Sequence, residues 1–206
     1  NKSFTLEDLE NTDPKLIKEM RNYYFNQIES YKKNKNKKIT IDKMPLNLVH
    51  VGEILRFFPN AKFILALRHP YDCVLSCFMQ NFMLNHAMAN FLNLDDTLKL
   101  YDLTMSLWKR YTNVFAIDHH LIRYEDVVSN FKKTIGDLLK FLNVKWSDNV
   151  IEFYKTAEKR GIINTPSYNQ VSQPIYSNSM YRWKNYEKEF AKSNISLENW
   201  VKEFNY

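Results

Sequence analysis

One arginine and one serine of the sequence have the side chains and the setting of an anion-binding pair. Arg68 ends a nearly continuous apolar run, and Pro70 then begins a predicted helix that contains Ser76. A guanidinium offers a rigid fork of N–H donors to a phosphate, a hydroxyl adds another donor, and the amino terminus of a helix favours negative charge. Arg68 and Ser76 are therefore candidates for a phosphate clamp. The structural alternative is a surface arginine beside a serine that faces its own helix.

Strands and helices that alternate along the chain must position these side chains. Apolar residues at helical spacing predict an amphipathic helix over residues 14–31. The β-branched stretch 39–41 predicts a strand that brings Lys43 to its carboxyl end. The apolar run 62–67 predicts a strand that is covered on both faces and ends at Arg68.

Further patterns complete an α/β fold. They predict a helix over 48–55 that Pro59 closes, a helix from Pro70, a helix over 94–108, a strand over 121–124, a mostly helical stretch over 141–165 and an ordered loop over 165–183. Strands that alternate with helices of this length favour a parallel sheet with right-handed crossovers, whose ligands bind beyond the carboxyl ends of the strands. Lys43, Arg68 and Tyr124 all lie near such ends.

The size and composition suit a single domain over residues 1–206. Of the 206 residues, 45% are hydrophobic and 15% are aromatic, which is enough for a substantial core. No apolar run approaches the roughly 18 residues of a membrane span, and the first residues open no signal peptide. Cys73 and Cys77 stand four apart on one predicted helix, where the usual disulfide geometry is not offered. We therefore expect buried thiols and a cytoplasmic location.

The net charge and the spacing of the glycines indicate which classes of ligand this chain could bind. The formal net charge of +6 favours anionic ligands without requiring nucleic acid, and the lysine run 32–38 is more typical of a solvated loop than of a nucleic-acid-binding arm. No HExxH motif or CxxC pair predicts a metal site. The three glycines, Gly52, Gly136 and Gly161, are too far apart for a GxxxxGK(S/T) or GxGxxG loop. A nucleotide-using α/β enzyme with this sequence would need its main phosphate loop from outside the chain.

Five blocks of the sequence resemble the sulfotransferase superfamily, whose members take a sulfuryl group from 3′-phosphoadenosine-5′-phosphosulfate. The blocks are Asp42-Lys43-Met44-Pro45, Phe58–Ile64, Arg68–Asp72 with Ser76, Arg123–Asp126, and Thr165–Tyr176 with Arg182-Trp183. The resemblance points in particular to tyrosylprotein sulfotransferases and to bacterial sulfotransferases whose catalytic domain is similar to theirs. It implies a parallel sheet flanked by helices, as in the P-loop nucleotide hydrolases. The N-terminal strand and the phosphosulfate loop of that fold have no counterpart in this sequence.

The resemblance implies roles for individual residues. Arg68 and Ser76 would hold the 3′-phosphate of the donor, and Tyr124 would meet its nucleotide. Lys43 would neutralise the charge that develops on the bridging oxygen as the sulfuryl group moves. Gln80 stands where the family carries a second basic residue, so the clamp is built differently at that position.

The resemblance also implies a loop that closes over the donor. Ser167 would support the transferring group, and Arg182 would reach the nucleotide. The loop residues implied to contact the donor are Ser167, Tyr168, Asn169, Gln170 and Val171. An ordinary loop with an aromatic anchor is the structural alternative.

The implied activity is the transfer of a sulfuryl group to a hydroxyl acceptor, which is a protein tyrosine, a sugar or a small-molecule alcohol. The family's catalytic base has no counterpart here, and Pro45 stands where cytosolic sulfotransferases carry a catalytic histidine. We therefore expect this segment alone to bind donor weakly and to turn over nothing detectable. Two alternatives stay open: a non-catalytic domain that binds an adenine nucleotide, and a small P-loop kinase.

Overall fold

The computed structural model describes residues 6–31, 39–155, 175 and 177–206. The chain divides into two units, of which unit 1 contains residues 1–61 and 107–118, and unit 2 contains residues 62–106 and 119–206. The long helix α5 (Leu94–Val114) contributes residues to both units. That residues 1–206 form a single domain stays a prediction.

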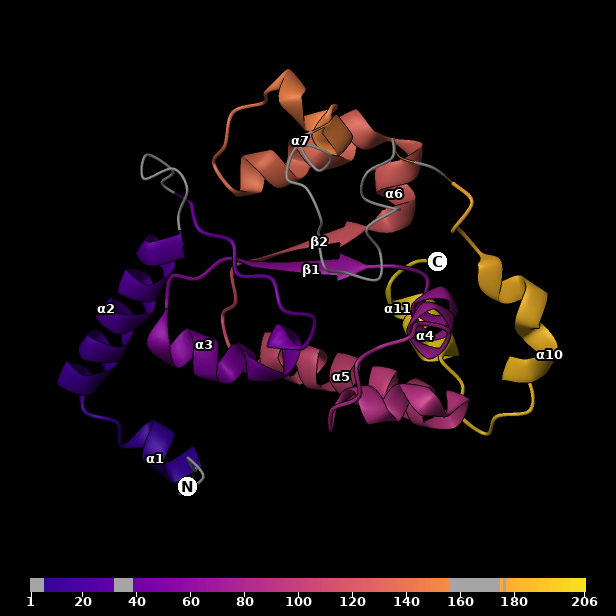
Figure 1. Ribbon diagram of the computed structural model, residues 1–206, viewed down its shortest axis with the longest axis horizontal. Coiled ribbons are helices and arrows are strands. Elements are labelled where there is room, and N and C mark those ends of the chain that lie inside the picture. Colours follow the sequence, from indigo (N-terminus) through magenta and orange to yellow (C-terminus); the bar gives the residue numbers. More distant parts are fainter. Residues whose placement is uncertain (1–5, 32–38, 156–174, 176) are drawn as a thin grey trace. The chain divides into compact units, whose positions relative to one another are not determined.

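Two parallel strands lie at the centre of unit 2. The strands β1 (Phe63–Leu67) and β2 (His119–Arg123) pair in a register that places Leu67 opposite Arg123. Leu65 and Leu67 are buried, but Ile64 and Ala66, which point to the other face, are exposed, so the prediction that both faces of this strand are covered is wrong. Helices occupy the chain between the two strands, as a parallel connection requires. These observations confirm the predicted α/β fold with a parallel sheet (Figure 1).

Helices surround this sheet within unit 2. In chain order they are α4 (Pro70–Phe78), η2 (Met88–Leu92), the first part of α5, α6 (Tyr124–Ser129), α7 (Phe131–Phe141), η3 (Asp148–Val150), η4 (Arg182–Tyr186), α10 (Glu187–Phe190) and α11 (Glu198–Glu203). Both α6 and α7 pack against β2, and Figure 1 shows them on one side of the strands, with α4 and α11 on the other. The helix α4 begins where predicted, because Pro70 at its first position has no N–H group that the helix would leave unpaired.

The C-terminal segment closes unit 2 against residues that lie far away in the sequence. The Trp200 indole N–H donates to Asp102 Oδ1 at 2.7 Å. The Arg123 guanidinium donates to the carbonyl oxygens of Phe204 and Asn205 at 3.2 and 2.6 Å. Trp200 and Phe204 are themselves buried, so this end of the chain belongs to the core of unit 2.

Unit 1 is helical in its described part. It contains α1 (Leu6–Glu10), α2 (Pro14–Tyr31), η1 (Asn47–His50), α3 (Val51–Phe57) and the last part of α5. The helix α2 matches the predicted range and packs against α3. The Tyr111 hydroxyl donates to the Val49 carbonyl at 3.0 Å and so fastens α5 to η1.

Two element predictions are wrong. Residues 39–41 form no strand, and Ile39 and Ile41 are exposed. A β-branched stretch becomes a strand only when its backbone pairs with another strand, and in the described part of the chain β1 and β2 pair only with each other.

The second wrong prediction concerns the stretch after Phe141, which is mostly non-helical over the described residues 142–155. Asn143 adopts a left-handed φ of 55°, and the Val144 N–H donates to the Leu139 carbonyl at 2.8 Å. This bond pattern ends a helix in the Schellman manner, and a short amide side chain tolerates the left-handed conformation it needs. Residues 156–165 lie outside the described residues.

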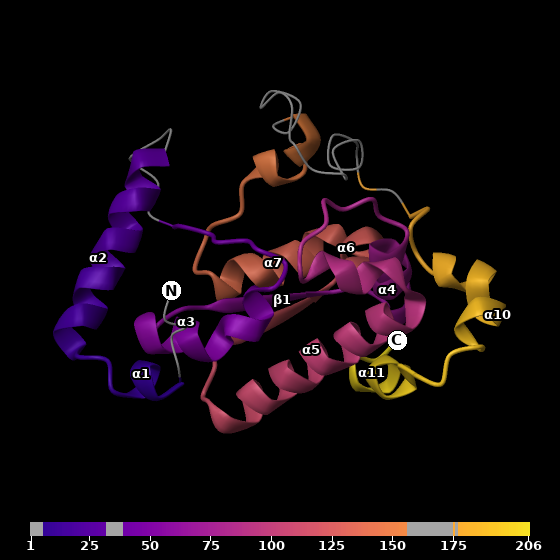
Figure 2. The ribbon, with the colours of Figure 1, turned by 60° about the horizontal axis from the view of Figure 1, so that its bottom comes forward.

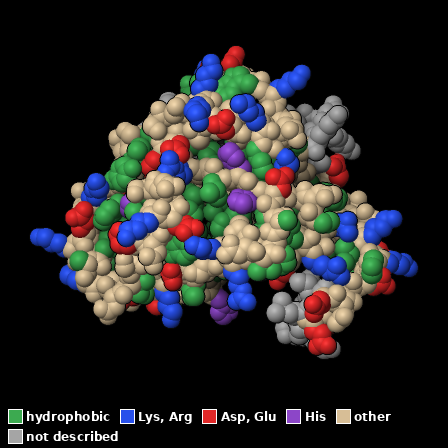
Figure 3. Space-filling view, turned by 180° about the vertical axis from the view of Figure 1, so that it is seen from behind, with side chains coloured by type: hydrophobic (Ala, Val, Ile, Leu, Met, Phe, Trp, Pro, Cys, Tyr) green, Lys and Arg blue, Asp and Glu red, His purple; other side chains and the backbone are tan. Residues whose placement is uncertain are grey.

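On the face shown in Figure 3, Lys and Arg side chains alternate with Asp and Glu side chains and gather in no single basic patch. None of the helices in the described ranges combines the length and the hydropathy that a membrane crossing requires.

Candidate functional site

Arg68 and Tyr124 meet at the carboxyl end of the sheet of unit 2. Arg68 directly follows β1, and Tyr124 directly follows β2 as the first residue of α6. Because parallel strands end at the same edge, the Arg68 guanidinium carbon lies 5.6 Å from the centroid of the Tyr124 ring. Figure 2 shows this end of the strands leading into α4 and α6. The structure therefore brings together two of the residues expected at a nucleotide site.

The Arg68 side chain is partly buried and incompletely paired. It is 22% exposed, and its Nη2 donates to the Ser179 carbonyl oxygen. The same nitrogen lies 3.9 Å from Asp72 Oδ2. Its Nε is buried and has no hydrogen-bond partner among the described residues. Because a buried donor without an acceptor is costly, this nitrogen favours an additional acceptor such as a phosphate oxygen.

Ser76 lies on the helix that follows Arg68. Residues four apart on a helix share a face, so Ser76 lies on the same side of α4 as Asp72, which contacts Arg68. The Ser76 side chain is exposed, whereas Asp72 is buried. A ligand held at Arg68 could therefore reach the Ser76 hydroxyl from solvent.

Glu125 holds the turn between β1 and α4, which the sequence reasoning missed. In the structure Glu125 is buried, and its Oε1 accepts a hydrogen bond from the His69 backbone N–H at 3.0 Å. This bond fixes the backbone next to Arg68. Its partner lies 56 residues away in the sequence, so no local pattern could have indicated it.

Aromatic rings cover the other side of this turn. The buried His69 ring stacks on Trp183 with centroids 5.1 Å apart and planes 17° apart. Trp183 also stacks on Tyr71 at 4.9 Å. Burial lowers the pKa of His69. These contacts agree with the structural alternative in which Trp183 is an aromatic anchor.

Cys73 and Cys77 are free thiols on α4 and are partly exposed. The Cys73 thiol donates a hydrogen bond to Cys77, which together with burial raises the pKa of Cys73. The same bond lowers the pKa of Cys77, and the Arg68 charge adds to this effect. The two thiols thus contact each other within α4 and, contrary to the prediction, neither is fully buried.

Lys43 lies in unit 1, in an exposed segment without regular structure. The neighbouring Asp42 accepts hydrogen bonds from the Tyr24 hydroxyl at 2.9 Å and from the Asn47 side-chain amide at 3.3 Å. Burial and the Asp42 carboxylate raise the pKa of Tyr24 to about 12. Lys43 is therefore held by the anchoring of Asp42 and not by a strand end as predicted.

The remaining predicted residues belong to the closing loop. Arg182 is described, begins η4 and is exposed. Ser167, Tyr168, Asn169, Gln170 and Val171 lie outside the described residues. Where side chains are described, no group of three or more His, Cys, Asp or Glu residues could hold a metal ion.

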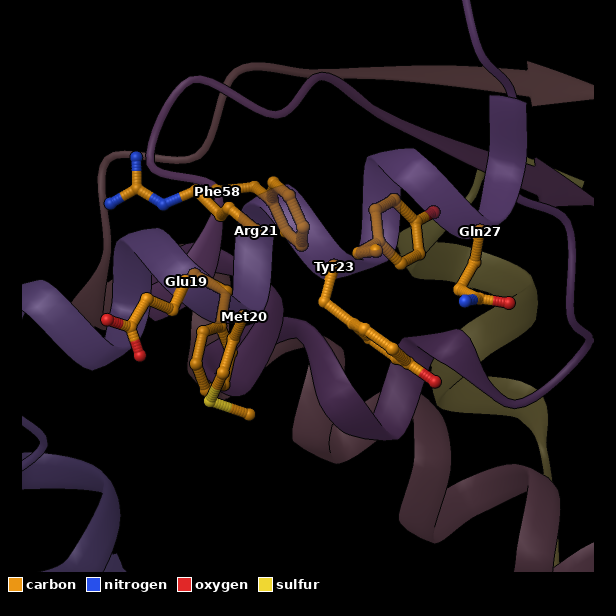
Figure 4. Close-up of a pocket in the computed structure, with 8 residues that line it drawn as sticks. Glu19, Met20, Arg21, Tyr23, Gln27 and Phe58 are labelled. Atoms are coloured by element: carbon orange, nitrogen blue, oxygen red, sulfur yellow. The ribbon is translucent and has the colours of Figure 1, made fainter. Parts of the chain in front are cut away.

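Unit 1 also has an apolar cavity of about 510 Å³ along α2 and α3. Figure 4 shows the charged ends of Glu19 and Arg21 directed away from the aromatic rings of this cavity. The lining residues are Glu19, Met20, Arg21, Tyr23, Tyr24, Gln27, Phe57 and Phe58. Tyr24 thus lines the cavity with its ring and binds Asp42 with its hydroxyl.

Comparison with known proteins identifies the class. A family model described as the sulfotransferase family matches residues 3–148, which include Lys43, Arg68, Ser76 and Tyr124. The chain therefore belongs to the sulfotransferase family. The structure is similar to that of a sulfotransferase domain from the curacin biosynthetic pathway, with a TM-score of 0.66 and 18% sequence identity, over 97% of this chain and 76% of that one. At this identity the similarity supports the fold alone.

Two relatives by sequence are longer proteins. An uncharacterized protein of Aquifex aeolicus (strain VF5) is 31% identical over 180 residues, which cover 85% of this chain and 23% of that protein. Protein-tyrosine sulfotransferase 1 of Danio rerio is 28% identical over 153 residues, which cover 69% of this chain and 41% of that protein. The chain thus spans less than half the length of either relative.

Proposed function

We propose that this chain takes part in the transfer of a sulfuryl group from 3′-phosphoadenosine-5′-phosphosulfate to a hydroxyl acceptor. The observation that carries this proposal is the Arg68 guanidinium, which lies at the carboxyl end of β1 beside Tyr124 and has a buried Nε without a partner in the described structure. The carboxyl ends of parallel strands are where α/β proteins bind nucleotides. Membership of the sulfotransferase family makes this donor the natural ligand.

In this proposal four residues of unit 2, Arg68, Ser76, Tyr124 and Arg182, bind the donor. Arg68 donates N–H groups to the 3′-phosphate, Ser76 adds a hydroxyl, and the amino terminus of α4 favours the dianion. Tyr124 lies beside the nucleotide, and Arg182 with residues 167–171 closes over it. These contacts hold the donor in position, which supplies much of the catalysis in transfers of this kind.

Lys43 is the proposed catalytic residue of unit 1, with Ser167 supporting the transferring group. The acceptor oxygen forms a bond to sulfur while the bond from sulfur to the bridging oxygen breaks, and 3′-phosphoadenosine-5′-phosphate leaves. A cation beside the bridging oxygen stabilises the charge that develops there, by about 3 kcal/mol if it acts like one oxyanion-hole donor. The acceptor proton must go to a base, and we assign that role to no residue of this chain.

The acceptor is a hydroxyl compound, and a protein tyrosine is our first choice. Support comes from the similarity to protein-tyrosine sulfotransferase 1 over 69% of this chain. A sugar or a small-molecule alcohol would use the same chemistry, so acceptors of all three kinds should be assayed.

The proposal is tested by nucleotide binding, measured by titration calorimetry of the whole chain. We expect adenosine 3′,5′-bisphosphate to bind at least tenfold more tightly than AMP, because only the former has a phosphate for Arg68. Arg68→Lys should lower the affinity for the bisphosphate about tenfold, since an ammonium cannot donate in a fork. Arg110→Lys, an exposed arginine outside the site, is the matched control. Equal affinities for the two nucleotides would contradict the proposal.

A further inference from the structure

Two hydrogen bonds fasten a distant segment of the chain to the Arg68 turn. Arg68 Nη2 donates to the Ser179 carbonyl oxygen, and the Trp183 backbone N–H donates to Asp72 Oδ1 at 2.8 Å. In each pair the partners are 111 residues apart in the sequence. The segment Ser179–Trp183 is therefore held at both ends by residues of a single turn and the helix that follows it.

The backbone between these two bonds is strained. Tyr181 has φ 55° and ψ 26°, the left-handed conformation, which costs a residue with a side chain about 1–2 kcal/mol. Its ring lies 5.6 Å from the His69 ring, centroid to centroid. Strain of this kind persists only where the surroundings fix the chain. The bonds to Ser179 and Trp183 do so, and they define the position at which Arg182 begins η4.

Asp72 is the common element of this arrangement. Its side chain is fully buried, and its Oδ2 lies 3.9 Å from Arg68 Nη2 and has no hydrogen-bond partner in the described structure. Burying a carboxylate is costly unless a cation and hydrogen bonds compensate for it. Arg68 supplies the cation and the Trp183 N–H supplies the hydrogen bond. The buried carboxylate of Asp72 is therefore stabilised both by Arg68 and by the segment Ser179–Trp183.

We propose that Asp72 is a positioning residue that couples anion binding at Arg68 to the placement of Arg182. An anion that takes N–H donors of Arg68 competes with Asp72 and Ser179 for them. The Trp183 end of the segment stays bound to Asp72, so Arg182 remains near the clamp when the anion arrives. This inference rests on the proposed function, because it takes the nucleotide as the anion.

The anchoring is measured first without ligand, by amide hydrogen exchange of the whole chain. The Trp183 amide should exchange slowly, and Asp72→Ala should accelerate it at least tenfold, because this N–H loses the acceptor that it has in the described structure. Asp72→Asn keeps an acceptor oxygen and should stay within about threefold of the unmodified chain. Asp126→Ala, which removes a carboxylate paired with Arg123, is the control and should leave Trp183 unchanged. Unchanged exchange in Asp72→Ala would overturn the proposal.

The coupling is measured next, by a double-mutant cycle of adenosine 3′,5′-bisphosphate affinity. Asp72→Ala should weaken binding about tenfold in the unmodified chain and at most threefold when Arg182→Ala is also present. A residue needed only for folding would give independent effects, so additive losses would overturn the coupling. Rescue by Asp72→Asn in the same assay is also expected.

Two further outcomes are decisive. If Asp72→Ala fails to fold, the unmodified chain is used instead. Saturating bisphosphate competes with Asp72 for Arg68 and should slow exchange at the Trp183 amide, which Asp72 still binds, and unchanged exchange there would refute the coupling. If the unmodified chain does not bind the bisphosphate, the proposed function fails, while the exchange of Trp183 still decides whether Asp72 anchors the segment.

Discussion

Arg68 is surrounded by titratable groups whose protonation depends on burial. The His69 ring next to it is buried between Trp183 and Tyr206, at centroid distances of 5.1 and 5.2 Å. Burial lowers its pKa, and the nearby Lys184 acts in the same direction. The charges of three carboxylates raise this pKa instead; they belong to Asp72, Glu125 and Glu198. Burial is the largest of these effects, so the pKa of His69 is lowered and the neutral ring is favoured.

The stability of the protein should therefore depend on pH through His69. The pKa of this residue is lower in the folded state than its ordinary value of 6.5, so below pH 6.5 the unfolded state binds more protons. The stabilisation is present above pH 6.5 and is lost as the pH falls through the folded-state pKa. Urea unfolding at pH about 7.5 and about 5.5 should show this loss, and His69→Gln should reduce it. His86→Gln, at an exposed histidine, is the control, and an equal loss in His69→Gln would contradict the assignment.

Glu125 should be important for stability although it touches no ligand in our proposal. Glu125→Ala leaves the buried His69 N–H without an acceptor and should lower the free energy of unfolding by about 1–3 kcal/mol. Glu125→Gln keeps an acceptor oxygen and should lower it less. Chemical denaturation of both variants measures the difference, and equal losses would show that the charge matters more than the bond.

The two described glycines, Gly52 and Gly136, lie on helices and differ in the space available for a side chain. A Cβ added at Gly136 in α7 would meet no atom within 4 Å. One added at Gly52 in α3 would lie 3.2 Å from the Tyr111 ring, which cannot move freely because its hydroxyl donates to Val49. A side chain therefore has open space at Gly136 and is crowded at Gly52.

Alanine at these two positions should have opposite effects. Gly136→Ala should raise the free energy of unfolding by about 0.5–1 kcal/mol, because alanine loses less backbone entropy in a helix. In Gly52→Ala the close contact with Tyr111 should outweigh the gain in backbone entropy, so this substitution should lower the unfolding midpoint. Each variant is the control for the other in thermal denaturation. A stabilised Gly52→Ala would show that α3 and α5 separate easily.

The last residues of the chain pack against the core of unit 2. Tyr206 packs on His69, and the Arg123 guanidinium carbon lies 5.4 Å from the centroid of its ring. Burial, together with the Glu125 charge, raises the pKa of Tyr206. The C-terminal residues therefore cover the ring of His69, whose backbone N–H is bound by Glu125.

Removal of residues 204–206 should destabilise unit 2 and loosen the Arg68 turn. The deletion exposes the His69 ring and leaves Arg123 without the two carbonyl oxygens that it binds, so we expect a loss of about 2–4 kcal/mol. Tyr206→Phe keeps the ring and should cost much less. Denaturant unfolding, with amide exchange of His69 as a local probe, measures both, and an unchanged midpoint in the deletion would contradict this role.

Much of the fold could be predicted because its signals are local. Helical spacing gave α2 and α5, a proline gave the start of α4, and a continuous apolar run gave β1 with Arg68 at its end. The family blocks then suggested Arg68, Ser76, Tyr124 and Lys43. Their roles in binding and catalysis stay predictions.

The sequence alone determined α2, α4, α5 and β1, with Arg68 at the end of that strand, because periodicity and turn residues act over a few positions. Only the tertiary structure decided that residues 39–41 stay unpaired, that Glu125 binds the His69 backbone and that Asp72 holds Trp183. A strand needs a partner, and a buried carboxylate needs a donor. Both partners come from distant parts of the chain that local patterns do not specify.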